Sequence, residues 1–215
     1  MSILTVATTK GGAGKTTLAR LILARLALQG LRLAAIDADL NRTLADWTSL
    51  AKFAVTVYHE LDKGRIVPLA DELSKTHDVV VIDTAGAASD SMLFAIGCSD
   101  LVLIPLQPSL GDIVEAVKTF QLIKSASLML KRDVLTRVVL LSVKETTGVA
   151  QHILTEASNA GLPLMQTRLS HLVAFQEMSF TGMAPAKGKA AKEIAALMEE
   201  IAALDILPEP SKLAS

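Results

Sequence analysis

Residues 8–17 read Thr8-Thr9-Lys10-Gly11-Gly12-Ala13-Gly14-Lys15-Thr16-Thr17. This stretch follows a short apolar run at residues 3–7 and opens a helical pattern. Because glycine has no Cβ, the glycines at 11, 12 and 14 allow backbone N–H groups to turn inward around an anion. The helix that starts next points the positive end of its dipole at the same place. An apolar strand, a glycine-rich loop, a Lys-Thr pair and a helix, in that order, predict a nucleotide-binding site.

Two lysines distinguish this loop from the ordinary phosphate-binding loop, G-x-x-x-x-G-K-S/T. Lys15 is placed to reach the β- and γ-phosphates, and the Thr16 hydroxyl is placed to ligate Mg²⁺. Counting back from Lys15, Thr9 occupies the position of the first glycine, and a second lysine, Lys10, follows it. The ordinary alternative for Lys10 is a solvated loop lysine. Its place beside the glycines favours a contact with phosphate instead.

The pattern K-G-G-x-G-K-T-T resembles the deviant Walker A motif of the ParA/MinD family of ATPases. The resemblance covers the chain up to about residue 180 and is closest to the small members that lack an N-terminal DNA-binding domain. It implies that ATP and Mg²⁺ are the cofactors and that Lys10 of one protomer reaches the phosphates of the other. ATP would then join two subunits face to face as a homodimer. The nucleotide-binding residues implied are Lys10, Gly11, Gly12, Ala13, Gly14, Lys15, Thr16 and Thr17.

Length and composition bound the class of protein. The 215 residues fit one domain, expected over 1–215 with a flexible tail from about residue 205. No apolar run approaches the roughly 18 residues of a membrane span. The net charge of −1 gives no global attraction to nucleic acid, so DNA binding would need a local basic patch. A single cysteine, Cys98, and the absence of a signal-peptide pattern predict a cytoplasmic protein. The resemblance to ParA-type ATPases implies that it associates with the nucleoid when it holds ATP.

Apolar strands alternate with helical patterns along the chain, which predicts an α/β fold with a mostly parallel sheet covered by helices on both faces. In the first helix we expect Leu18, Leu21 and Ile22 to face the core and Arg20 to face away. Ligands of such sheets bind at the carboxyl ends of the strands. The predicted strands are 2–8, 31–36, 55–58, 78–83, 101–105, 137–143 and 164–167, and the predicted helices are 15–29, 42–51, 66–75, 89–96, 111–130, 147–159, 171–181 and 187–204.

Acidic residues at two strand ends complete the predicted site. Asp83 ends a β-branched run and has the position of a Walker B acid, which would hold a water bound to Mg²⁺. A helix cap or turn is the ordinary alternative for such an Asp. The segment 37–42 resembles the family's switch I motif, D-x-D-P-Q, with Leu in place of Pro and Asn in place of Gln. The resemblance makes Asp39 the acid that positions the attacking water, catalytic together with Lys10 and Lys15. The metal set it implies is Thr16, Asp39 and Asp83, while Asp37 is expected to be structural.

Other segments resemble the family less completely. Residues 84–87 resemble the switch II loop, whose small residues suit a backbone that moves near the γ-phosphate. Residues 37–47 resemble small homologues associated with conjugative DNA transfer. Near residues 141–144, larger members place an Asn that contacts adenine, and Ser142 and Lys144 do not match it.

By resemblance, the chain is a switch: a slow ATPase that dimerises with ATP and is stimulated by a ParB-like centromere-binding protein or an adaptor. We expect nonspecific DNA binding and DNA partition first. A MinD-like membrane ATPase, transfer-DNA recruitment and organelle positioning remain as alternatives. The acids at Glu199 and Glu200 disfavour anionic lipid. Solvated helix faces explain either basic group as well as DNA does when each is taken alone. These groups are Lys187, Lys189 and Lys192, and Lys131, Arg132 and Arg137.

Other enzyme classes built on this fold fit the sequence less well. The nitrogenase iron protein needs two cysteines per chain, and this chain has one. Related amidoligases need an additional substrate site, and none is apparent. A regulator that phosphorylates its own tyrosine cluster is disfavoured because Tyr58 is the one tyrosine.

Overall fold

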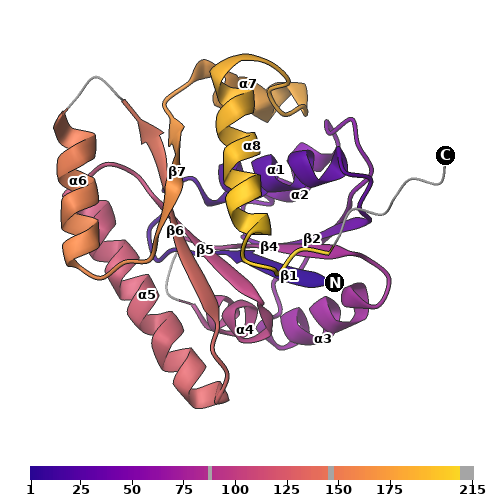
Figure 1. The fold of residues 1–215 in the computed structure, drawn as a ribbon. Coiled ribbons are helices and arrows are strands. Elements are labelled where there is room, and N and C mark those ends of the chain that lie inside the picture. Colours follow the sequence, from indigo (N-terminus) through magenta and orange to yellow (C-terminus); the bar gives the residue numbers. More distant parts are fainter. Residues whose placement is uncertain (87–88, 145–147, 209–215) are drawn as a thin grey trace.

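The computed structural model of the chain describes residues 1–86, 89–144 and 148–208 (Figure 1). It is an α/β fold built on one seven-stranded sheet, with the strand order β3-β2-β4-β1-β5-β6-β7. The strands are β1 (Ser2–Val6), β2 (Leu33–Ala38), β3 (Thr56–His59), β4 (Val79–Thr84), β5 (Leu101–Leu106), β6 (Leu135–Val143) and β7 (Leu164–Ser170). The helices are α1 (Lys15–Ala27), α2 (Thr43–Thr48), α3 (Lys63–Ser74), α4 (Asp90–Cys98), α5 (Leu110–Leu130), α6 (Gly148–Asn159), α7 (Val173–Thr181) and α8 (Gly188–Ala202).

Every paired strand in this sheet is parallel, so both faces need a cover of helices (Figure 1). Successive side chains of each central strand point to opposite faces of the sheet. Leu4 of β1 packs with α1 and α8, whereas Ile3 packs with α3. One layer therefore holds α1, α2, α7 and α8, and the other holds α3, α4, α5 and α6. This arrangement confirms the predicted fold class, and every predicted element is present with ends within three residues of the expected ones.

Short polar side chains set where several helices begin. Ser109 accepts a hydrogen bond from the backbone N–H of Asp112 at 3.1 Å, and α5 starts at the next residue. Ser89 caps α4 in the same way, and Asp62 caps α3 by accepting from Gly64 at 2.9 Å. These caps explain why α3 begins three residues before the apolar pattern that predicted it. At its other end α5 stops at Lys131, whose φ of 52° lies in the left-handed region.

The register of the central strands brings the predicted site residues to one edge of the sheet. Val6, the last residue of β1, lies opposite Asp83 of β4, and Asp83 lies opposite Asp37 of β2. The glycine-rich loop continues from β1, so it starts beside both acids. The carboxyl-end location of the site is therefore confirmed. A single domain over 1–215 stays a prediction, and residues 209–215 of the expected tail lie outside the described residues.

Within the described ranges, no helix is both long and apolar enough to cross a membrane. The helices that come last pack on the sheet. Glu200 of α8 accepts the backbone N–H groups of Gln166 and Thr167 at 2.6 and 2.9 Å, and Glu193 accepts that of Ser170 at 2.8 Å. Since β7 is an edge strand, these carboxylates occupy hydrogen-bonding positions that would otherwise be open. The strand β7 itself continues three residues beyond its predicted end.

Candidate nucleotide-binding site

The loop between β1 and α1 has the backbone of an anion cradle. Gly12 and Gly14 have φ values of 73° and 97°, which residues with a Cβ rarely adopt. A Cβ on Gly14 would also lie 2.7 Å from the Cδ1 atom of Leu141. No side chain caps the first turn of α1. Its N–H groups are therefore available to a bound anion, as the sequence pattern predicts.

Lys15 lies inside this loop and is 6% exposed. Its Nζ atom donates to the backbone oxygen of Lys10 at 3.2 Å. Burial lowers the pKa of the Lys15 ammonium, while Asp83 and Asp39 raise it. The backbone of Gly86 approaches closely, because a Cβ there would lie 2.7 Å from the Cα of Gly11 and 3.1 Å from Lys15 Nζ. A second loop thus closes over the lysine, with glycine at the contact.

Asp83 is fully buried, and neither carboxylate oxygen has a hydrogen-bond partner among the described residues. Burial raises the pKa of this carboxyl to about 7, although the Thr16 side chain and the charge of Lys15 lower it. A buried carboxylate without partners is costly unless a cation or an ordered water serves it. No three acidic, His or Cys side chains in the described part of the chain converge into a metal site. The partnerless buried carboxylate of Asp83 fits a site that accepts a cation, and the metal ligands Thr16, Asp39 and Asp83 stay a prediction.

Asp37 is also fully buried, but both of its carboxylate oxygens accept hydrogen bonds. One oxygen accepts the N–H groups of Leu44 and Ala45 at 2.9 Å each, and the other accepts that of Asp39 at 3.1 Å. Asp37 therefore fixes the first turn of α2 to the end of β2. These contacts support the structural role expected for it.

Asp39 is held by the residue that replaces the family's Gln. One Asp39 oxygen accepts from both the backbone and the side-chain amide of Asn41 at 2.9 Å. The ring Nε2 of His59 lies 3.0 Å from the Asp39 carbonyl oxygen. Leu40, which stands in place of the family's Pro, is 77% exposed. Local hydrogen bonds thus shape a loop that the family shapes with proline. The predicted role of Asp39 toward water remains a prediction.

The Lys10 side chain contacts the start of α5. Its Nζ atom forms an ion pair with Asp112 at 2.7 Å, and its side chain is 41% exposed. Asp112 is 5% exposed and also accepts from the Ser109 hydroxyl. Next to it, the Thr9 hydroxyl donates to Glu115 of α5 at 2.6 Å. The first turns of α5 therefore hold the outer side of the loop, and the reach of Lys10 across a dimer stays a prediction.

One sequence expectation was wrong. Arg20 does not face solvent; it is 9% exposed and lies beneath the site. It donates to the Thr43 carbonyl at 2.6 Å and stacks over the Trp47 ring at 5.4 Å. Burial lowers the pKa of its guanidinium, while Asp83 and Asp37 raise it. Because α1 is buried on nearly every side, helical periodicity could not identify an outer face. The signal that could have located Arg20 is the pair of buried acids, Asp37 and Asp83, because buried acids need a cation nearby.

A cavity of about 340 Å³ adjoins the loop and was not predicted. Gly12 and Gly14 form one side, and Ser142 forms the end of β6. His171, between β7 and α7, and Phe175 of α7 also line the cavity. Its place beside the phosphate loop and its ring-bearing walls suit a nucleobase. Ser142 lies in the region where the resemblance places an adenine contact, but nothing in the sequence pattern pointed to His171.

Comparison with known proteins identifies the chain's relatives. A family model described as VirC1 protein matches residues 1–202. Protein virC1 of Rhizobium radiobacter is 31% identical over 193 residues, which are 85% of this chain and 82% of that protein. Protein ParA of the same organism is 29% identical over 184 residues, 82% and 83% of the two chains. Maintenance of carboxysome distribution protein A of Halothiobacillus neapolitanus is 28% identical over 214 residues, 92% and 95%.

Solved structures share the fold at lower identity. The septum site-determining protein MinD of Pyrococcus horikoshii, in complex with Mg-ADP, gives a TM-score of 0.77 at 15% identity, over 95% of this chain and 97% of that one. McdA of Cyanothece, in complex with ATP, also gives 0.77 at 15% identity, over 97% and 98%. The fold is therefore that of the MinD/ParA ATPases, and these two solved proteins hold Mg-ADP and ATP respectively.

Proposed function

The chain belongs to the VirC1 family of ParA/MinD-type ATPases, and from this premise we propose that it is a dimerising switch driven by ATP. The observation that carries the proposal is the division between the two lysines of the loop. Lys15 is buried inside the loop, where its Nζ atom donates to the Lys10 carbonyl oxygen, whereas the Lys10 side chain is 41% exposed and pairs with Asp112 of α5. One lysine serves the nucleotide of its own chain, and the other is free to serve a neighbour once it leaves Asp112.

Each residue of the site has a separate proposed role in ATP hydrolysis. Loop N–H groups and Lys15 would bind the phosphates, and the Thr16 hydroxyl and Asp83 would hold the metal, Asp83 through a bound water. When bound, Mg²⁺ neutralises charge that develops on the phosphoryl oxygens. Asp39, on the loop that Asp37 and Asn41 fix, orients water. Positioning dominates such chemistry, so a slow rate that a partner protein raises by completing the site is the expected behaviour.

The cargo of this switch is DNA or a complex bound to DNA. Relatives named ParA and virC1 match this chain about equally well, so recruitment of transfer DNA is supported as strongly as plasmid partition. Positioning of an organelle has support from the carboxysome-distribution relative. Lys187 and Lys192 are exposed at the start of α8, beside α7 in Figure 1, and α7 borders the cavity next to the nucleotide loop. We propose that this basic group contacts DNA and couples that contact to the nucleotide state.

A binding assay tests the proposal directly. Biolayer interferometry on immobilised duplex DNA of unrelated sequences should show binding with ATP and Mg²⁺ that is absent with ADP. Binding should fall steeply as salt rises, because phosphate contacts release counterions. Charge reversal at Lys187 and Lys192 should abolish it, whereas reversal at the exposed Lys52 should not. Tight binding to anionic vesicles with none to DNA at low salt would favour a MinD-like membrane role instead.

A further inference from the structure

We infer that the C-terminal end of α5 is a docking surface for an acidic amphipathic helix of a partner protein. This surface lies at the amino-terminal edge of β6, whereas the nucleotide loop lies beyond the carboxyl ends of the strands (Figure 1). It is separate from every residue assigned to the nucleotide. The inference therefore goes beyond the proposed ATPase function and does not depend on it.

The surface contains an apolar groove of about 560 Å³ between three helices. Leu93 and Phe94 of α4 are 39% and 42% exposed, and Val67 of α3 is 37% exposed. Met129 of α5, at 85%, is among the most exposed large apolar side chains of the described residues. Single exposed apolar residues are ordinary, but a contiguous set in a groove indicates an interaction site. Grooves between helices typically accept the apolar face of another helix.

A basic hollow of about 780 Å³ lies on the other side of the same helix end. Lys124, Lys131 and Arg137 line it together with one acid, Asp133, so positive charge is in excess. No ion pair joins these three cations to an acid among the residues the structure describes. Lys124 lies over the Phe120 ring at 4.6 Å. Leu128, 80% exposed, stands in the wall of this hollow, one residue before Met129 in the groove. Apolar and positive surfaces therefore meet at the last turn of α5.

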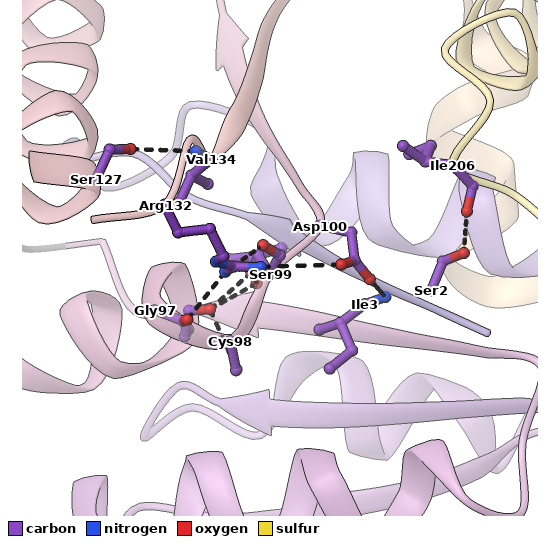
Figure 2. A network of polar contacts seen from close by, with 12 residues as sticks. Ser2, Ile3, Gly97, Cys98, Ser99, Asp100, Ser127, Arg132, Val134 and Ile206 are labelled. Carbon is purple, nitrogen blue, oxygen red and sulfur yellow. Dashed lines mark hydrogen bonds and ion pairs between the residues drawn. The ribbon is translucent and has the colours of Figure 1, made fainter. Parts of the chain in front are cut away.

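The backbone between groove and hollow is fixed before any partner arrives. Figure 2 shows Arg132 extending from the segment after α5 toward the end of α4. Its Nη2 atom donates to the carbonyl oxygens of Gly97 and Ser99 at 3.0 and 2.8 Å, and Nη1 lies 4.0 Å from Asp100. Asp100 in turn accepts the N–H of Ile3 at 2.8 Å. A preorganised surface loses little conformational entropy on binding, which favours a specific partner.

Charge identifies the occupant. A second copy of this chain, paired about a two-fold axis, would bring Lys131 toward its own counterpart. Duplex DNA would satisfy the basic rim but would leave Leu93, Phe94 and Met129 exposed. A helix with apolar residues at i, i+3, i+4 and i+7 and acids along one flank satisfies both groove and hollow. The partner therefore presents an acidic amphipathic segment.

A selection experiment reads the chemistry of the partner without assuming its identity. Random 18-residue peptides on phage are selected on the full-length protein and depleted on its Met129→Asp variant. Peptides that survive should carry Asp or Glu beside apolar residues at helical spacing. Their affinities, measured by fluorescence anisotropy, should fall at least about tenfold in Met129→Asp. Lys124→Glu/Lys131→Glu should lower affinity similarly and should favour peptides whose acids are changed to Lys.

Matched variants control for nonspecific effects. Leu28→Asp alters a 71% exposed leucine elsewhere, and Lys52→Glu/Arg168→Glu reverses two exposed charges outside the surface. Both should leave peptide affinity unchanged, and unaltered ATP binding shows that each variant is folded. The inference is overturned if no selected peptide depends on Met129, or if dependent peptides are basic or uncharged. Binding to vesicles of phosphatidylglycerol and phosphatidylcholine that is lost in Met129→Asp, without dependent peptides, would assign the surface to lipid.

Discussion

The two sides of the phosphate loop differ in how their lysines are held. On the inner side, Lys15 is 6% exposed and its Nζ atom donates to the Lys10 carbonyl oxygen, so its charge is held inside the loop. On the outer side, Lys10 is paired with Asp112 at 2.7 Å but keeps 41% of its side chain exposed. A confined charge suits a ligand that is always the chain's own. A tethered but accessible charge suits a contact that forms and breaks, and the predictions below test this difference.

The largest effect is expected at the inner lysine. Lys15→Ala should lose ATP binding by at least about a hundredfold, because a buried, charge-assisted phosphate contact has no substitute nearby. Titration of a fluorescent ATP analogue measures this loss. Lys75→Ala, on the surface of α3, is the matched control. Affinity within threefold of wild type would show that the inner lysine is not the phosphate ligand.

Asp39→Ala should separate binding from chemistry. Because Asp39 acts on water and not on the bound nucleotide, ATP affinity should persist while the hydrolysis rate falls by about two orders of magnitude. The ATP-bound dimer should consequently live longer in light scattering after size exclusion. Hydrolysis at the wild-type rate would remove Asp39 from the catalytic role.

Lys10→Ala should bind ATP nearly normally yet fail to dimerise. Two facing nucleotides bring negative charge together, and a lysine from each side offsets the repulsion. Size-exclusion chromatography with light scattering, with and without ATP, measures the effect. Lys10→Arg is an informative companion because its planar group differs from a point charge. A Lys10→Ala protein that dimerises with ATP and hydrolyses it normally would return Lys10 to an ordinary loop lysine.

Asp83→Asn should stabilise the nucleotide-free protein. Since burial raises the carboxyl pKa in the folded state to about 7, deprotonation opposes folding, and wild-type stability should fall as pH rises from about 4 toward 7. The variant removes that loss, so its gain in melting temperature should be larger at pH 8 than at pH 5. Thermal unfolding at both pH values measures it, and protection by Mg-ATP should weaken. An equal gain at both pH values would mean that Asp83 is already charged and served by other groups.

The smallest effect is expected at Asp112, which forms the ion pair with Lys10. Asp112→Asn keeps the side-chain shape that Ser109 contacts but removes the charge that holds Lys10. ATP-dependent dimerisation should tighten a few-fold, in line with a partly exposed ion pair. Sedimentation velocity across a protein concentration series resolves such a change. Weaker dimerisation would mean that Asp112 helps the dimer directly.

Local patterns predicted the fold and the loop because strand runs, glycines and the strand-end acids are readable one segment at a time. Contacts between distant segments were less accessible. Nothing in the sequence near Lys10 indicates that Asp112, 102 positions later, receives it. Arg20 was placed on the wrong side because its helix is enclosed by both the sheet and α2. His171 in the cavity likewise depends on how β7 pairs with β6, a register the sequence does not show.

The carboxylates of Glu193 and Glu200 of α8, which accept backbone N–H groups of β7, have a consequence for assembly. A strand from another molecule could extend the sheet along β7 only by first displacing these acids from the backbone N–H groups they accept. The helix α8 therefore blocks the addition of another strand at that edge. If the chain gathers at high local density on its cargo, as the proposed function requires, this protected edge prevents strands of neighbouring molecules from pairing irreversibly. For this reason we expect its self-association to be reversible and to give oligomers of defined size.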